Sequence, residues 1–150
     1  MTSVDVENLF TNIPLMEAIE IIIDNCYNHQ SIEQPKIPKH LLKELLILCT
    51  SNSPFRHIYG KKEGIAMGSL LGPTFANFYI GYIENEVLKI LDIKASIYTR
   101  NVNDIFVVVE NENQLRELKN KFEEKPILKF NYEMSTNNHI LFLDVKVENI

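Results

Sequence analysis

Apolar and polar residues alternate, or recur at helical spacing, in a series of short segments that predicts a mixed fold. Residues 2–6 alternate as a short strand does, and Asn12 is expected to cap a helix that has Pro14 in its first turn. A second helix is expected to begin near Pro38, and a longer one after Pro73. The first two helices are expected to bury the stripes Leu15, Ile19, Ile22, Ile23 and Cys26, and Leu41, Leu42, Leu45, Leu46, Leu48 and Cys49.

The rest of the chain predicts strands that are joined mainly by turns. An amphipathic helix is expected over residues 113–125, and turns are expected around Gly60, over residues 101–104 and over residues 135–138. The predicted strands are residues 55–59, 63–67, 97–100, 105–109, 128–134 and 140–147. This order of elements predicts an α+β fold in which helices cover an antiparallel-rich sheet.

Composition is that of a globular protein with a core of its own. Of the 150 residues, 45% are hydrophobic and 23% are charged, which predicts one domain over residues 1–150. The sequence has no apolar run near the roughly 20 residues that cross a bilayer and no N-terminal signal pattern, so we expect no membrane partner and an intracellular location, nuclear or cytoplasmic. Cys26 and Cys49 are expected to be reduced core thiols, with a disulfide between them as the alternative.

The net charge of −5 argues against a free-standing nucleic-acid-binding protein, because such proteins usually carry a basic excess. Basic residues nevertheless gather in three places, which we interpret as solvated faces. They are Lys36, Lys39, His40 and Lys43; Arg56, His57, Lys61 and Lys62; and Lys119, Lys121, Lys125 and Lys129. A role in phosphate binding requires the fold to bring some of them beside a candidate site.

The candidate chemistry comes from two aspartates near strand ends and a glycine-rich stretch between them. Asp5 lies in the first predicted strand, and Asp104 ends the turn at 101–104. Carboxylates from neighbouring strands can hold divalent metal ions, which prefer oxygen ligands. Taken alone, Asp5 is more typical of a turn or a helix cap. The glycines at 64–73 would allow a flat, charged ligand to approach the backbone.

Four blocks of the sequence resemble motifs of reverse transcriptases, in the form found in Penelope-like retroelements. DVENLFTNIP at 5–14 resembles motif A, GIAMGSLLGPTFANFYI at 64–80 resembles motif B, and YTRNVNDIFVV at 98–108 resembles motif C. KFNYE at 129–133, followed by Phe142-Leu143-Asp144, resembles motif D and the primer grip. The blocks occur in the family's order and cover nearly the whole chain.

This resemblance implies a ferredoxin-like polymerase palm that carries out template-directed DNA synthesis by nucleotidyl transfer with two metal ions. It implies an RNA template, a DNA primer and dNTP as partners, and Mg²⁺ or Mn²⁺ as the cofactor. The motif A and motif C positions imply Asp5, Asn103 and Asp104 as catalytic residues. Asp5, the Val6 carbonyl and Asp104 would be the metal ligands.

The resemblance also implies residues for the nucleotide and the primer, and all of them except Met67 have a structural alternative. Phe10 would clash with a ribose 2′-hydroxyl, or else pack in the core. Met67 and Gly68 would lie against the nucleotide, or else Gly68 would only form a turn. Phe142, Leu143 and Asp144 would support the primer, or else form a buried strand end.

Departures from the family pattern predict impaired activity. Asn101 replaces the motif C tyrosine, and Asn103 replaces its first aspartate, so that an amide stands where the main motif C metal ligand belongs. We expect metal affinity and turnover to fall by orders of magnitude. Leu70 stands at a usual proline position, a milder change. The fingers and thumb of a polymerase are expected to be largely missing. The alternatives are a non-catalytic remnant that binds nucleic acid or protein, and a decayed element without a function.

Overall fold

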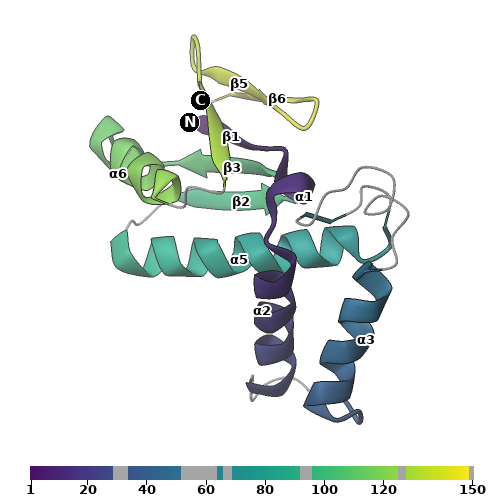
Figure 1. The fold of residues 1–150 in the computed structure, drawn as a ribbon. Helices are drawn as coiled ribbons and strands as arrows, with labels where there is room; N and C mark the ends of the chain where they lie inside the picture. Colours follow the sequence, from purple (N-terminus) through teal and green to yellow (C-terminus); the bar gives the residue numbers. More distant parts are fainter. Residues whose placement is uncertain (29–33, 52–63, 66–68, 92–95, 125–127, 149–150) are drawn as a thin grey trace. The chain divides into compact units, whose positions relative to one another are not determined.

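The computed structural model describes residues 1–28, 34–51, 64–65, 69–91, 96–124 and 128–148 (Figure 1). The chain divides into two compact units, one made of Met1–Leu9 with Ile83–Ile150 and one made of Phe10–Tyr82. The elements are β1 (Thr2–Glu7), α1 (Leu9–Asn12), α2 (Leu15–Asn28), α3 (Lys39–Ser51), α5 (Gly72–Leu91), β2 (Ile97–Asn101), β3 (Asp104–Val108), α6 (Glu112–Glu123), β4 (Lys129–Met134), β5 (His139–Phe142) and β6 (Val145–Glu148). Most of the predicted hairpin at 55–59 and 63–67 lies outside the described residues.

The first unit contains a four-stranded sheet in the order β2-β3-β1-β4. Every neighbouring pair is antiparallel. In the chain, α5 comes between β1 and β2, and α6 comes between β3 and β4, which gives the βαββαβ connectivity of a ferredoxin-like fold. The predicted α+β class with an antiparallel sheet is therefore confirmed.

One face of this sheet forms the core of the first unit. Alternate residues of β1 are buried, and the register places Ile105 and Val107 of β3 on the same face as Val4. Helix α6 covers this side as the amphipathic pattern predicted, burying Leu115, Leu118 and Phe122. The rings of Phe122 and Phe130 lie 4.9 Å apart between their centroids. Because Asp5 lies between the buried residues Val4 and Val6, it belongs to the opposite face.

The C-terminal segment differs from its prediction. Residues 140–147 were expected to form one strand, but β5 and β6 pair with each other around a two-residue turn at Leu143 and Asp144. Their φ angles are 49° and 62°, as a tight hairpin of this kind requires. The prediction was wrong because neither residue is the usual asparagine or glycine of such a turn. The Phe142 ring lies 5.3 Å from that of Phe106, so the hairpin packs against the sheet face opposite the helices.

The second unit contains α1, α2, α3 and the first part of α5. Asn12 was expected to cap α2, but it ends the short helix α1 instead. Helix α2 begins after Pro14, whose carbonyl accepts a hydrogen bond from the Ala18 N–H at 3.0 Å. The stripe predicted for α2 is buried except for Cys26, which is half-buried, and Ala18 and Ile21 are buried with it.

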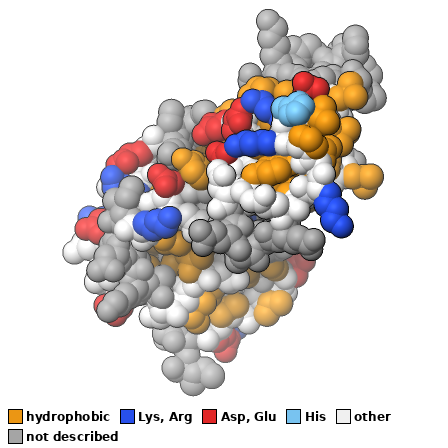
Figure 2. Space-filling view, turned by 90° about the horizontal axis from the view of Figure 1, so that it is seen from below, with side chains coloured by type: hydrophobic (Ala, Val, Ile, Leu, Met, Phe, Trp, Pro, Cys, Tyr) orange, Lys and Arg blue, Asp and Glu red, His pale blue; other side chains and the backbone are white. Residues whose placement is uncertain are grey.

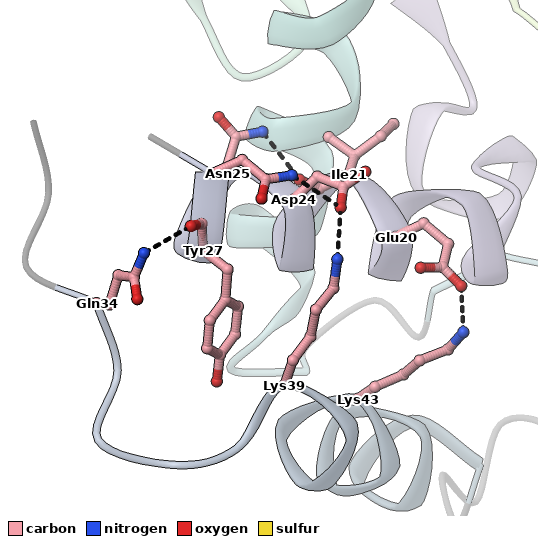
Figure 3. Close-up of polar contacts among 9 residues, drawn as sticks. Glu20, Ile21, Asp24, Asn25, Tyr27, Gln34, Lys39 and Lys43 are labelled. Carbon is pink, nitrogen blue, oxygen red and sulfur yellow. Dashed lines mark hydrogen bonds and ion pairs between the residues drawn. The ribbon is translucent and has the colours of Figure 1, made fainter. Parts of the chain in front are cut away.

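The leucine face of α3 is less buried than expected. Leu41, Leu45 and Leu48 are 43%, 48% and 58% exposed in the described part of the chain. Cys49 is exposed as well, so the prediction of a core thiol was wrong, and both cysteines are free. Two ion pairs, Lys39 with Asp24 and Lys43 with Glu20, join α3 to α2 (Figure 3). None of the described helices combines the length and the apolar character needed to cross a bilayer.

Candidate active site

The two predicted metal-binding aspartates lie directly opposite each other on adjacent strands. The register pairs Asp5 of β1 with Asp104 of β3. The same register pairs Asp104 with Asn101 on β2, and Asp5 with Asn131 on β4. Directly paired residues of an antiparallel sheet have Cβ atoms about 4.5–5.5 Å apart. Asn101, Asp104, Asp5 and Asn131 therefore form one polar row across the face that the helices leave open.

Asn103 joins this row from the turn between β2 and β3. Its main-chain carbonyl accepts a hydrogen bond from the Val6 N–H at 3.0 Å. Its side-chain amide donates to Asp5 Oδ1 at 2.7 Å. A carboxylate only accepts hydrogen bonds, so the amide nitrogen is the atom that must face Asp5. The structure thus brings together the three predicted catalytic residues Asp5, Asn103 and Asp104, although Asp5 is nearly a hundred positions from the other two in the sequence.

Asp104 has an unfavourable electrostatic environment. Burial raises the pKa of its carboxyl above the ordinary value, and the negative charge of Asp5 raises it further. A divalent cation between the two carboxylates would relieve this repulsion, so the donor set fits a hard metal ion. Among the described residues, no cluster of three or more His, Cys, Asp or Glu side chains could hold a metal ion. Asn103, which lies beside these two carboxylates, is an amide and adds no charge.

A buried charged group lies behind the turn, and the sequence reasoning missed it. Tyr98 donates its hydroxyl hydrogen to Glu84 Oε1 at 2.6 Å, and Arg100 Nε donates to the same oxygen at 2.8 Å. Arg100 Nη1 also donates to the Val102 carbonyl at 3.0 Å. Burial and the nearby Glu84 carboxylate raise the pKa of Tyr98. One available signal was Glu84, a charge on the apolar face of the helix after Pro73.

Asn131 was also missed, although it lies within the block that resembles motif D. It is exposed and lies directly opposite Asp5. The available signal was the alternation of β4, in which Phe130 is buried on one face and its neighbour must point to the other.

The start of the glycine-rich stretch is tied to α1 within the second unit. The Ile65 N–H donates to the Phe10 carbonyl at 2.6 Å, and the Gly64 N–H donates to the Ile13 carbonyl at 3.2 Å. Phe10 is half-buried, and its predicted contact with the nucleotide stays a prediction. Met67 and Gly68 lie outside the described residues.

The predicted primer grip is the tip of the β5–β6 hairpin. Phe142 is half-buried against Phe106, whereas Leu143 is 47% exposed and Asp144 is exposed as well. The alternative interpretation as a buried strand end was therefore wrong. Phe106 shares the open face with Asp104, two residues away on β3, so the hairpin lies on the sheet face that carries the aspartates. Contact with a primer stays a prediction.

Many of the clustered lysines form ion pairs with nearby carboxylates. Lys39 lies 2.9 Å from Asp24, and Lys43 pairs with Glu20 (Figure 3). On α6, Lys119 pairs with Glu123 at 3.7 Å, and Lys121 pairs with Glu124 at 2.6 Å. On the face shown in Figure 2, basic side chains are scattered among acidic ones. The cluster at 56–62 lies outside the described residues.

Lys129 is placed differently from the other clustered lysines. It is exposed on β4, opposite Glu7 and two residues from Asn131, and so belongs to the same open face as Asp5.

Comparison with known proteins supports the fold. No family model matches the chain, and no curated protein matches it. A solved structure of apo telomerase from Candida tropicalis, truncated from the C-terminal domain, superimposes with a TM-score of 0.68 at 15% sequence identity. The match covers 98% of this chain and 33% of the telomerase chain, so the chain spans about a third of that protein's length. At this identity the likeness concerns the fold alone, which is α+β with an antiparallel sheet.

Proposed function

We propose that this chain is the palm of a reverse transcriptase related to those of Penelope-like retroelements, with residues 1–150 forming a partial reverse transcriptase domain. Its fold is that of part of a telomerase structure. The observation that carries the proposal is the pairing of Asp5 with Asp104 on the open sheet face, with Asn103 bonded to Asp5. The sequence blocks that resemble motifs A and C supply these residues in the family's order. An intracellular location remains part of the proposal.

The donor set at the open face suits Mg²⁺ or Mn²⁺. Asp5 and Asp104 would be the acidic ligands, and the Val6 carbonyl would be a neutral one. A pair of such ions, when bound, would activate the primer hydroxyl and stabilise charge on the leaving oxygens. The chain's own contribution is to hold two carboxylates that repel each other on adjacent strands. The ligands are therefore in place before a metal ion binds.

The remaining site residues are proposed from the resemblance. Phe10, Met67 and Gly68 would contact an incoming dNTP. The hairpin tip, Phe142 to Asp144, would hold the primer strand of an RNA–DNA duplex, which agrees with its location on the face that carries Asp5. An exposed leucine at the tip offers an apolar contact for a sugar or base.

The amide at position 103 makes this palm a poor catalyst. Asn103 adds no charge, and its N–H occupies an Asp5 oxygen that a metal ion would need. Loss of one acidic ligand removes several kcal/mol of charge stabilisation, which corresponds to about 100-fold or more in rate. Primer extension with Mg²⁺ or Mn²⁺ tests this directly, comparing the unaltered chain with Asn103→Asp.

We expect synthesis to be undetectable or weak with asparagine and to increase by about 100-fold with aspartate. Asp24→Asn removes an exposed acid of α2 and should change neither result, whereas Asp5→Asn in the Asn103→Asp chain should abolish the gain. Robust synthesis by the unaltered chain would contradict the impairment. A folded Asn103→Asp chain without any gain would contradict the role given to this position.

A second candidate is a non-catalytic module that binds nucleic acid. The amide–carboxylate bond favours it, because that bond satisfies Asp5 without a cation. A mobility-shift titration of the unaltered chain with an RNA–DNA duplex at several salt concentrations tests it. Affinity that falls as salt increases would support the module, and the absence of salt-dependent binding would exclude it.

A further inference from the structure

The turn that carries Asn103 has an unusual backbone. Asn101 pairs with Asp104, so Val102 and Asn103 alone connect β2 to β3. Val102 has a φ of 55°, in the left-handed region that a β-branched residue rarely adopts. Such conformations persist only where the surrounding structure determines them. Some contact outside the turn must therefore keep Val102, and Asn103 after it, in place.

The Val6 N–H holds the Asn103 carbonyl from β1, and Arg100 provides the contact to Val102 itself. Its Nη1 donates to the Val102 carbonyl at 3.0 Å, while its Nε donates to Glu84 Oε1 at 2.8 Å. The side chains of Arg100 and Glu84 are only 15% and 12% exposed, so water competes weakly for these bonds. Glu84 lies on α5, which brings a rigid helix to the back of the turn. A planar guanidinium binds a carboxylate and a carbonyl through donors of fixed direction, whereas the donors of an ammonium group rotate on a flexible stem.

We infer that Arg100, anchored by Glu84, is a positioning residue that fixes the Val102–Asn103 turn so that residue 103 reaches Asp5. The part of this inference that concerns metal binding rests on the proposed function. The part that concerns the turn does not, because the Asn103–Asp5 bond exists in the chain as it stands.

The first test reads the Asn103–Asp5 bond by NMR. In the unaltered, isotope-labelled chain, the Asn103 side-chain amide should show slowed exchange and a downfield proton shift, in a signal that Asn103→Asp removes. Arg100→Lys retains a positive charge beside Glu84 but loses the fork that reaches Val102, so this signature should disappear. Tyr98→Phe removes the other bond to the same Glu84 oxygen without touching the turn, and the signature should remain.

A rescue variant separates positioning from general stability. Glycine adopts positive φ without steric cost, so Val102→Gly should relieve the turn's dependence on Arg100. The double variant Arg100→Lys with Val102→Gly should regain at least part of the signature. A merely structural role of Arg100 predicts no such recovery. Retention of the signature in Arg100→Lys alone would overturn the inference.

The second test measures Mn²⁺ affinity in the Asn103→Asp chain, with Mn²⁺ alone as the probe and electron paramagnetic resonance as the readout. Loss of an outer partner of a metal ligand typically costs about 10-fold to 100-fold in affinity, and we expect this loss for Arg100→Lys and an unchanged affinity for Tyr98→Phe. If Asn103→Asp binds no Mn²⁺ while the amide signature still depends on Arg100, the proposed metal site fails and the positioning role stands. Equal Mn²⁺ affinity in the Asn103→Asp chain with and without Arg100→Lys or Tyr98→Phe would overturn the positioning role at the metal site.

Discussion

Asn103 and Asp104 follow each other in the chain, yet only one of them adds negative charge beside Asp5. The Asn103 amide donates a hydrogen bond to Asp5 at 2.7 Å, whereas the Asp104 carboxylate faces Asp5 across the strand pair. The amide attracts the Asp5 carboxylate, and the charge of Asp104 repels it. At the residue scale, the site therefore contains one favourable contact, between Asn103 and Asp5, and one repulsive contact, between Asp104 and Asp5.

The repulsion between Asp104 and Asp5 predicts that stability depends on pH. The pKa of Asp104 is higher in the folded chain than its ordinary value, because of burial and the charge of Asp5. Between the unfolded and folded pKa values the folded state binds more protons, so this carboxyl lowers stability as pH rises through that interval. Asp104→Asn should therefore be more stable than the unaltered chain at about pH 7 and should lose this advantage towards about pH 4. Thermal unfolding at both pH values measures this, and an advantage that grows on acidification would contradict it.

A second prediction at the residue scale concerns Gly64. Its φ is 91°, and a Cβ at this position would lie 2.7 Å from the Thr11 carbonyl oxygen. Gly64→Ala should destabilise the chain by more than about 1 kcal/mol, since the new methyl group meets backbone and the conformation is strained for alanine. Denaturant unfolding gives the value, with Thr74→Ala on the exposed side of α5 as a control expected within about 0.5 kcal/mol. Equal stability of the two variants would show that α1 can move away.

At the scale of elements, the β2–β3 hairpin could be predicted from the sequence, but the β5–β6 hairpin could not. The turn at 101–104 could be predicted because asparagines and an aspartate interrupt two apolar runs. The turn at Leu143 and Asp144 could not, because a leucine in the left-handed region is unfavourable and the flanking pattern continues through it. Likewise, the spacing of leucines predicted helix α3 correctly but not its exposure, since the sequence does not show which face a neighbour covers.

The turn of the β5–β6 hairpin allows a prediction about stability. Replacing Leu143-Asp144 with Asn-Gly supplies the residues that prefer two positive φ angles. The double variant should stabilise the chain by about 0.5–1 kcal/mol, measured by denaturant unfolding, because both replaced side chains are exposed. The single variant Val145→Asn, outside the turn, should give no stabilisation. A loss of stability in the double variant would show that the leucine or the aspartate makes a contact that outweighs its strain.

At the scale of the whole molecule, the order of elements was enough to predict the fold class, whereas the convergence of Asp5 with Asp104 was predicted from the resemblance to motifs A and C. Antiparallel strands that are adjacent in a βαββαβ fold place such residues opposite each other by register. The Glu84–Arg100 pair could not be predicted, because it depends on how α5 packs against β2, which a pattern of apolar residues does not specify. The same limit applies to charge: a count of −5 does not reveal which lysines are already paired.

The distribution of charge predicts where nucleic acid would bind. Lys129 shares the open sheet face with Asp5 and Asp104, whereas Lys39 pairs with Asp24 in the other unit. If an RNA–DNA duplex binds across the open face, Lys129→Glu should weaken binding and reduce the slope of log affinity against log salt by about 1 to 2, because one phosphate contact is lost and a repulsive charge is added. Lys39→Glu makes the same charge change and should leave the slope nearly unchanged. Mobility-shift titrations at several salt concentrations compare the two, and equal slopes would place the nucleic acid elsewhere than on the face that carries the aspartates.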